Sequence, residues 1–249
     1  MTPRRFSPVL LLLAVLTACQ PSYHLAQQAA NRIQVDSTTA TADPGMASFL
    51  QPYRQKLDQT MNAVLARSTG PIEKSQPNGP LNDILTDALL QQASQKYGKP
   101  IDVSHLNFGG IRNNLPAGNI TIGSIYEVMP FDNKLVILTL TGDMLMQLLN
   151  HFAEGNKLVV GGLRATIHDG KVQSATLTNG RAIQPSETYT VAMSDYVAEG
   201  GDNAGFLKNP VKREDINYLI RDALIDYFRQ RGQSGQPITP TTDGRITIE

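Results

Sequence analysis

The sequence predicts an α+β fold, a mixed sheet with flanking helices, in a single domain over residues 46–249. Three observations lead to this fold class. Apolar residues recur at helical spacing in several separate segments. Between them lie short runs rich in β-branched and other apolar residues, which are typical of strands. The two kinds of segment do not alternate regularly, and this argues against a series of βαβ units.

Helices are expected where apolar side chains repeat every three to four residues. The pattern occurs in 46–65 and again in 81–89, where Pro80 lies near the expected start of the helix. Thr141 is expected to cap a third helix. The longest pattern predicts one helix over 211–229.

Strands are expected in runs of strand-forming residues that are bounded by turn residues. These runs are 101–106, 135–140, 158–167, 172–177, 189–193 and 245–248. The segment 71–80 is expected to be a loop, because Pro77 and Gly79 break any regular element there.

Residues 1–19 predict a lipoprotein signal peptide. Arg4 and Arg5 precede an apolar run at 9–16, which is far shorter than the roughly 20 residues that span a bilayer and has the length of a signal-peptide core. The run leads into Leu-Thr-Ala-Cys, which resembles a lipobox ending at Cys19. Because this is the only cysteine of the chain, we favour lipidation at Cys19 over a secretory signal with an incidental cysteine.

Lipidation would hold the protein on the membrane through its acyl chains, since each buried CH₂ contributes roughly 0.8 kcal/mol. Gln20 follows the cysteine, instead of the aspartate associated with inner-membrane retention. We therefore expect an exported, lipid-anchored protein of the cell envelope, on the outer membrane if the host has one. Residues 20–45 are polar and predict a tether, with an edge strand at 32–35 as an alternative.

The overall composition points away from several classes of protein. Lysine plus arginine and aspartate plus glutamate each total 22, so no charge excess indicates a nucleic acid polymer as partner. A single cysteine cannot form an internal disulfide. The four histidines are scattered along the chain and are expected to be structural or exposed: His24, His105, His151 and His168.

The first stretch whose residues could bind a ligand is Asn-Phe-Gly-Gly-Ile-Arg at 107–112, which contains a pair of glycines. Gly109 and Gly110 allow a tight turn and a close approach of a ligand to the backbone. Arg112 offers a planar fork for a phosphate or a carboxylate. The alternative is a simple turn after a strand. The stretch is not a P-loop, because no Gly-Lys-Ser/Thr follows.

Two further stretches contain aromatic residues. Pro-Phe-Asp-Asn at 130–133 precedes the 135–140 strand, and Phe131 alone would be read as a core residue. Tyr196 precedes Gly200, Gly201 and Asp202, an arrangement that suits stacking on a base and hydrogen bonding to ribose hydroxyls. The alternative is a helix C-cap followed by a solvated aspartate.

Taken together and in this order, the stretches resemble the C-terminal domain of the 5′-nucleotidase and UDP-sugar hydrolase family. The likeness includes N-x-G-G-I-R at 107–112, L-x-x-G-x-I-T-x-G at 115–123, Tyr126 and P-F-x-N at 130–133. It continues through a Thr-Gly before a helix to the final G-G-D, and it covers about residue 65 to the C-terminus.

The resemblance implies that this domain binds the nucleoside end of a nucleotide. The base would lie between the rings of Phe131 and Tyr196, and stacking contributes roughly 1–3 kcal/mol per base. The resemblance places Asp202 on the ribose hydroxyls, Asn107 on the base edge and Arg112 on the phosphate. The remaining residues of the implied substrate-binding site are Asn133 and the loop glycines Gly109, Gly110, Gly200 and Gly201.

The sequence also departs from the family pattern. Tyr196 stands where phenylalanine is common, Phe108 replaces a small residue and Asp132 replaces a frequent glycine. Residues 203–205 lengthen the loop after Asp202. Lys74 lies where the family has a further arginine, and a point charge replaces an arginine fork only partly.

The relatives hydrolyse phosphate esters with two metals held by Asp-x-His and Gly-Asn-His motifs, which this sequence lacks. We therefore expect no cofactor and no catalytic residue in this chain, with divalent metals in a partner phosphoesterase. Two functions remain open. The chain is the nucleotide-binding part of a split 5′-nucleotidase with a separate metallophosphoesterase chain, or it is a non-catalytic nucleotide-binding or interaction lipoprotein.

Overall fold

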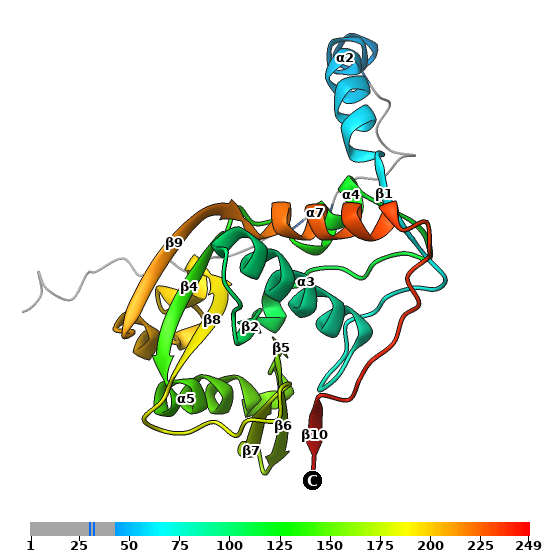
Figure 1. Ribbon diagram of the computed structural model, residues 1–249. Helices are drawn as coiled ribbons and strands as arrows, with labels where there is room; N and C mark the ends of the chain where they lie inside the picture. The colour runs from blue at the N-terminus through cyan, green and yellow to red at the C-terminus, as the bar shows by residue number, and fades with distance from the viewer. Residues whose placement is uncertain (1–29, 31, 33–42) are drawn as a thin grey trace, which may run out of the picture. The chain divides into compact units, whose positions relative to one another are not determined.

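The computed structural model of the protein describes residues 30, 32 and 43–249 (Figure 1). Cys19, the signal segment and nearly all of the expected tether lie outside the described residues, as do residues 33–35 of the alternative edge strand. The chain divides into two compact units, Met1–Leu50 and Gln51–Glu249. Among the described residues, no helix is both long enough and apolar enough to cross a lipid bilayer.

The first described helix is shorter than predicted. Helix α2 covers Pro44–Met61, and none of its residues is buried. The prediction of one helix over 46–65 is wrong at its end, because Val64 and Leu65 belong to strand β1 (Val64–Ser68). This strand pairs antiparallel with β3 (Gly118–Thr121), so a long-range pairing overrides the local helical spacing.

The centre of the second unit is a five-stranded sheet in the order β5-β2-β8-β4-β9. Its strands are β2 (Val103–His105), β4 (Lys134–Thr141), β5 (Val160–Gly161), β8 (Thr188–Ser194) and β9 (Lys212–Leu219). Strands β2 and β8 are parallel, and the other neighbouring pairs are antiparallel. The sheet is therefore mixed, as the sequence predicted.

Apolar side chains cover both faces of this sheet. Along β4, Leu135 and Ile137 belong to one apolar cluster, whereas Val136 and Leu138 belong to the other, as the period of two in a strand requires. The first cluster includes residues of α3 (Pro80–Tyr97), α4 (Ile122–Val128) and α7 (Ile220–Gln233). The second includes residues of α5 (Gly142–Ala153). This burial explains why 135–140 reads as a continuous apolar run.

The helix termini follow the sequence signals. Pro80 occupies the first turn of α3, and Gly98 ends that helix in the left-handed region with φ of 75°. The Thr141 hydroxyl accepts a hydrogen bond from the backbone N–H of Met144 at 3.2 Å, so Thr141 caps α5 as predicted.

A smaller three-stranded sheet, in the order β10-β6-β7, packs beside α5 (Figure 1). Its strands are β6 (Leu163–His168), β7 (Lys171–Leu177) and β10 (Ile246–Ile248). The predicted strand 158–167 is divided between β5 and β6 by Gly162, where φ is 84°. A Cβ at Gly162 would lie 2.2 Å from the Asp102 carbonyl oxygen, so only glycine fits this turn.

The predicted helix over 211–229 is wrong over residues 211–219. Residues Lys212–Leu219 form edge strand β9, which pairs with β4, and the helix begins at Ile220. In β9 the partly buried residues alternate with exposed ones, and Ile216 and Tyr218 pack against the first apolar cluster. Ile216, Leu219 and Ile220 also match helical spacing, which explains the error.

Among the histidines that the structure describes, His105 is fully buried. His105 at the end of β2 is 0% exposed, and its ring lies 4.2 Å from the ring of Phe152. Within the described residues, neither of its ring nitrogens has a hydrogen-bond partner. Burial lowers the pKa of the His105 imidazole from 6.5 to about 3, so the folded protein keeps this ring neutral.

We predict that His105 makes the protein acid-sensitive. Below pH 6.5 the unfolded chain takes up a proton at this histidine, whereas the folded chain does so only near pH 3. The free energy of unfolding therefore falls as pH drops between these values, by up to about 1.4 kcal/mol per pH unit. Urea unfolding from pH 7 to pH 4 measures this slope. His105→Leu should reduce the slope of the unfolding free energy against pH. His168→Gln, which changes an exposed histidine, should leave this slope unchanged. Equal slopes in all three proteins would refute the prediction.

Candidate functional site

Strand directions bring three distant segments to one edge of the five-stranded sheet. Because β2 and β8 are parallel, their carboxyl ends lie at the same edge. Strand β4 is antiparallel to β8, and Leu135 near the start of β4 pairs with Ser194 at the end of β8. The loops after β2, before β4 and after β8 therefore meet at this edge.

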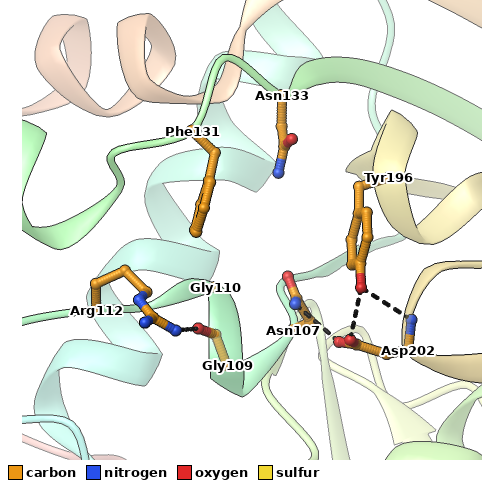
Figure 2. A pocket seen from close by; sticks show the side chains of 8 residues that line it. All are labelled: Asn107, Gly109, Gly110, Arg112, Phe131, Asn133, Tyr196 and Asp202. Atoms are coloured by element: carbon orange, nitrogen blue, oxygen red, sulfur yellow. Dashed lines mark hydrogen bonds between the residues drawn. The ribbon is translucent and has the colours of Figure 1, made fainter.

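These loops enclose a pocket of about 350 Å³. Eight residues line it: Asn107, Gly109, Gly110, Arg112, Phe131, Asn133, Tyr196 and Asp202 (Figure 2). All eight are among the ten binding residues that the sequence predicted. Gly200 and Gly201 lie in the loop that ends at Asp202 and do not line the pocket. The volume lies within the range of small-molecule sites.

The segment after β2 presents backbone to the pocket. A 3₁₀ turn over Phe108–Gly110 follows Asn107, and the N–H of Gly110 donates to the Asn107 carbonyl at 2.9 Å. A Cβ at Gly110 would lie 2.6 Å from the Asn107 side-chain oxygen, whereas a Cβ at Gly109 would meet no atom within 4 Å. Gly110 therefore makes room for Asn107, and Gly109 leaves an open approach to the backbone.

Arg112 is the charged side chain at one end of the pocket. It is exposed, and its Nη1 donates to the Gly109 carbonyl at 3.0 Å. Lys74 is not among the pocket-lining residues, because its Nζ donates to the Ile111 carbonyl at 2.6 Å and lies 4.4 Å from the Phe108 ring centroid. Burial, with a smaller effect of the Arg112 charge, lowers the pKa of the Lys74 ammonium.

Phe131 lies in the loop between α4 and β4 and is not a core residue. Its side chain is 41% exposed and borders the pocket. The interpretation of a lone aromatic as core is therefore wrong here, because the loop carries the ring away from both apolar clusters. Figure 2 shows Phe131 and Tyr196 on opposite sides of the pocket, with Asn133 at the rim between them.

Tyr196 lies in α6 (Asp195–Ala198), directly after β8. The ring is 46% exposed and faces the pocket. Gly200 ends this short helix with φ of 94°, as a C-cap glycine does. Gly201 packs against the tyrosine, since a Cβ there would lie 2.5 Å from both the ring Cε1 and the backbone oxygen of Tyr196.

Asp202 is held by three side chains rather than left to solvent. One carboxylate oxygen accepts from Asn107 Nδ2 at 2.8 Å, and the other accepts from the Tyr196 hydroxyl at 3.0 Å. The Asp202 carbonyl accepts from His151 Nε2 at 2.8 Å, so this nitrogen carries the proton. The alternative prediction was a helix C-cap followed by a solvated aspartate. The cap is present, but the Asp202 carboxylate is held by hydrogen bonds from Asn107 and Tyr196.

The pocket thus combines two aromatic rings, an oriented carboxylate, two amides and a guanidinium. Such a set suits a ligand with a flat ring, hydroxyl groups and a negative charge. Within residues 43–249, no group of three or more histidine, cysteine, aspartate or glutamate side chains is placed to hold a metal ion.

Sequence reasoning missed two residues that support the pocket. His151 in α5 holds the backbone of Asp202, and Arg221 in α7 donates to the backbone oxygen of Phe131 at 3.2 Å. Neither residue belongs to the stretches that the sequence singled out, and each is far along the chain from its partner. Only the three-dimensional arrangement identifies them.

Comparison with known proteins gives the same family as the sequence motifs. The family described as "5′-nucleotidase, C-terminal domain" matches residues 57–209. This match covers more than half of the chain, so the chain belongs to the 5′-nucleotidase C-terminal domain family.

Individual relatives agree with this family. The chain is 26% identical to a 5′-nucleotidase of Vibrio vulnificus, covering 74% of this chain and 35% of that protein. It is also 26% identical to the cell wall protein Lmo0130 of Listeria monocytogenes, covering 86% and 30%. The crystal structure of a 5′-nucleotidase precursor from Thermus thermophilus matches with a TM-score of 0.69 at 26% identity, covering 81% and 42%. The chain thus spans 30–42% of these three proteins.

The contact between Gly201 and Tyr196 gives a prediction about stability. Gly201→Ala adds a methyl group against the tyrosine ring and backbone and should lower the free energy of unfolding by about 1–3 kcal/mol. Gly205→Ala in the same loop is the matched control, because its Cβ would meet no atom within 4 Å. Urea unfolding of both variants checks the prediction, and equal stabilities would contradict it.

Proposed function

We propose that this chain binds the nucleoside part of a nucleotide and serves as the specificity domain of a 5′-nucleotidase-type phosphoesterase in nucleotide catabolism. One observation carries the proposal. Phe131 and Tyr196 come from segments far apart in the sequence, yet they line opposite sides of one pocket that also contains Asp202 and Arg112 (Figure 2). The family supports a nucleotide-related substrate.

The chemistry of each group suits one part of a nucleotide. A base between the two rings gains stacking on both faces. The Asp202 carboxylate accepts hydrogen bonds from ribose hydroxyls, and hydrogen bonds to a charged acceptor are the stronger kind. Asn107 and Asn133 offer amide donors and acceptors for base and sugar edges. Arg112 provides the bidentate fork for a phosphate.

Hydrolysis, in this proposal, requires a separate metallophosphoesterase chain. Two-metal hydrolysis needs a nest of carboxylates and imidazoles around both ions, and the described residues contain no such group. This chain would hold the nucleotide while the partner supplies the divalent metals. We further propose that Cys19 is lipidated and anchors the assembly in the cell envelope.

A second candidate is a non-catalytic envelope lipoprotein that captures nucleosides. The phosphate end of the pocket favours it. Arg112 is the one cation among the pocket-lining residues, because Lys74 is engaged with the Ile111 carbonyl and the Phe108 ring. A weak phosphate contact would make nucleosides and nucleotides bind almost equally well.

Removing either ring should weaken binding of a nucleoside. Phe131→Ala and Tyr196→Ala each delete one stacking surface, and we expect each to lower the affinity for adenosine by about 1–3 kcal/mol, or about 5- to 150-fold. Tyr196→Phe keeps the ring and removes only the hydroxyl that donates to Asp202, so it should lose less affinity than Tyr196→Ala. Isothermal titration calorimetry measures the adenosine affinity of the wild type and the three variants. Unchanged affinity in both alanine variants would end the stacking proposal.

Phosphate release separates the two candidate functions. We expect no release from nucleoside monophosphates by the chain with Mn²⁺ or Zn²⁺ alone, and release when a metallophosphoesterase from the same organism is added, because the metals are expected on the partner. Arg112→Gln should reduce the release. Binding without release in every mixture would favour the non-catalytic lipoprotein, and release by the chain alone would contradict both candidates.

A further inference from the structure

Arg221 is a buried arginine that lies beside the pocket without lining it. It is the second residue of α7 and its side chain is 7% exposed. Strand β9 ends where β4 begins, since Leu219 pairs with Lys134, so the start of α7 lies beside the loop that carries Phe131. The fold thus places a guanidinium behind one wall of the pocket.

The contacts of Arg221 converge on this loop. Nη1 donates to the Phe131 carbonyl at 3.2 Å, and Nη2 bonds the carboxylate of Asp132. The guanidinium carbon lies 4.1 Å from the Tyr126 ring centroid, a cation–π contact that comes from α4 on the other side of the loop. The neighbouring N–H of Ile220 donates to the Asn133 carbonyl at 2.9 Å. The loop is therefore held by hydrogen bonds at three successive residues, Phe131, Asp132 and Asn133.

Phe131 belongs to neither apolar cluster of the core. The residue is 41% exposed, and its side chain borders the pocket. The guanidinium carbon of Arg112 lies 6.0 Å from the centroid of the Phe131 ring, and Arg112 is itself exposed. A stacking surface binds more tightly when it is held in place before the ligand arrives, because less ordering is then required on binding. The backbone contacts from Arg221 and Ile220 supply that constraint.

The cost of burying Arg221 argues for a specific role. Burial of a guanidinium is unfavourable unless its donors are satisfied. Within the described residues, Arg221 Nε has no hydrogen-bond partner, so the side chain does not make every bond it could. Its Nη1 and Nη2 each donate a hydrogen bond to the Phe131 loop. The Asp132 side chain is 80% exposed and gives the loop a carboxylate for Arg221 to bind.

We propose that Arg221 is a positioning residue that fixes Phe131 as one wall of the nucleoside slot, with Asp132 as its anchor on the loop. This inference rests on the proposed function for its consequence in binding. The effect of Arg221 on the order of residue 131 does not depend on a ligand and can be measured in the free protein. Arg221 acts through Phe131 and does not touch the ligand.

The absence of tryptophan from the sequence provides a test that needs no ligand. Phe131→Trp places a single indole on the pocket wall, and time-resolved fluorescence anisotropy reports its local motion. Adding Arg221→Gln should increase the fast, local depolarisation. The matched control is Arg229→Gln, which removes another arginine of α7 whose partner is Asp226, away from the loop. Equal local motion with and without Arg221 would overturn the proposal.

Calorimetry with adenosine then tests the consequence through a double-mutant cycle. Arg221→Gln should lower the affinity about 3- to 30-fold in the wild-type background and have no further effect in Phe131→Ala, because coupled residues are not additive. The affinity of Arg221→Lys for adenosine should lie between those of the wild type and Arg221→Gln, since a lysine can bind Asp132 but cannot bind the Phe131 carbonyl at the same time. Equal losses in both backgrounds would overturn the proposal. Absence of adenosine binding by the wild type would instead refute the proposed function and leave the anisotropy test decisive.

If Arg221→Gln does not fold, Asp132→Ala takes its place in both experiments. The Asp132 side chain is mostly exposed, so its removal spares the core while it deletes the anchor of the guanidinium. We expect a smaller increase in local motion and a smaller loss of affinity, again absent in Phe131→Ala. No change in local motion would overturn the proposal by this route as well.

Discussion

The directions of three neighbouring strands are the constraint on which the site depends. Strand β8 runs parallel to β2 on one side and antiparallel to β4 on the other. This pairing brings the end of β2, the end of β8 and the start of β4 to one edge, and all the pocket-lining loops leave from there. Any other direction for β4 would carry Phe131 to the opposite edge of the sheet. The buried apolar faces of β4 stabilise this arrangement from both sides.

At that edge Asp202 links the loops to one another. Its backbone, and that of Asn203, adopt the left-handed region with φ of 50° and 64°. Such a conformation costs about 1 kcal/mol or more per residue, although aspartate and asparagine tolerate it best. Hydrogen bonds from Asn107, Tyr196 and His151 offset the cost and join the loop to the segment after β2, to α6 and to α5. The carboxylate is thereby oriented before any ligand binds.

Much of this protein could be predicted from its sequence, and the errors have a common cause. The apolar runs gave most strands and helices correctly, and the motifs identified the residues that line the pocket. The errors at Val64 and at 212–219 arose where strand pairing with distant partners outweighed local spacing. His151 and Arg221 escaped notice because their roles consist of contacts across 51 and 89 or 90 residues of chain. Sequence motifs therefore predict the residues that line the pocket more easily than the residues that hold these in position.

We propose that this member of the 5′-nucleotidase C-terminal domain family has a nucleoside-binding pocket that is formed before the ligand binds. The two walls have different supports: one is fixed by the loop around Asp202 and the other by the start of α7. The most direct measurement is a crystal structure of the protein grown with adenosine. We expect the base between the rings of Phe131 and Tyr196, with the ribose hydroxyls on Asp202. An adenosine bound elsewhere, or a pocket left empty at saturating adenosine, would contradict the account.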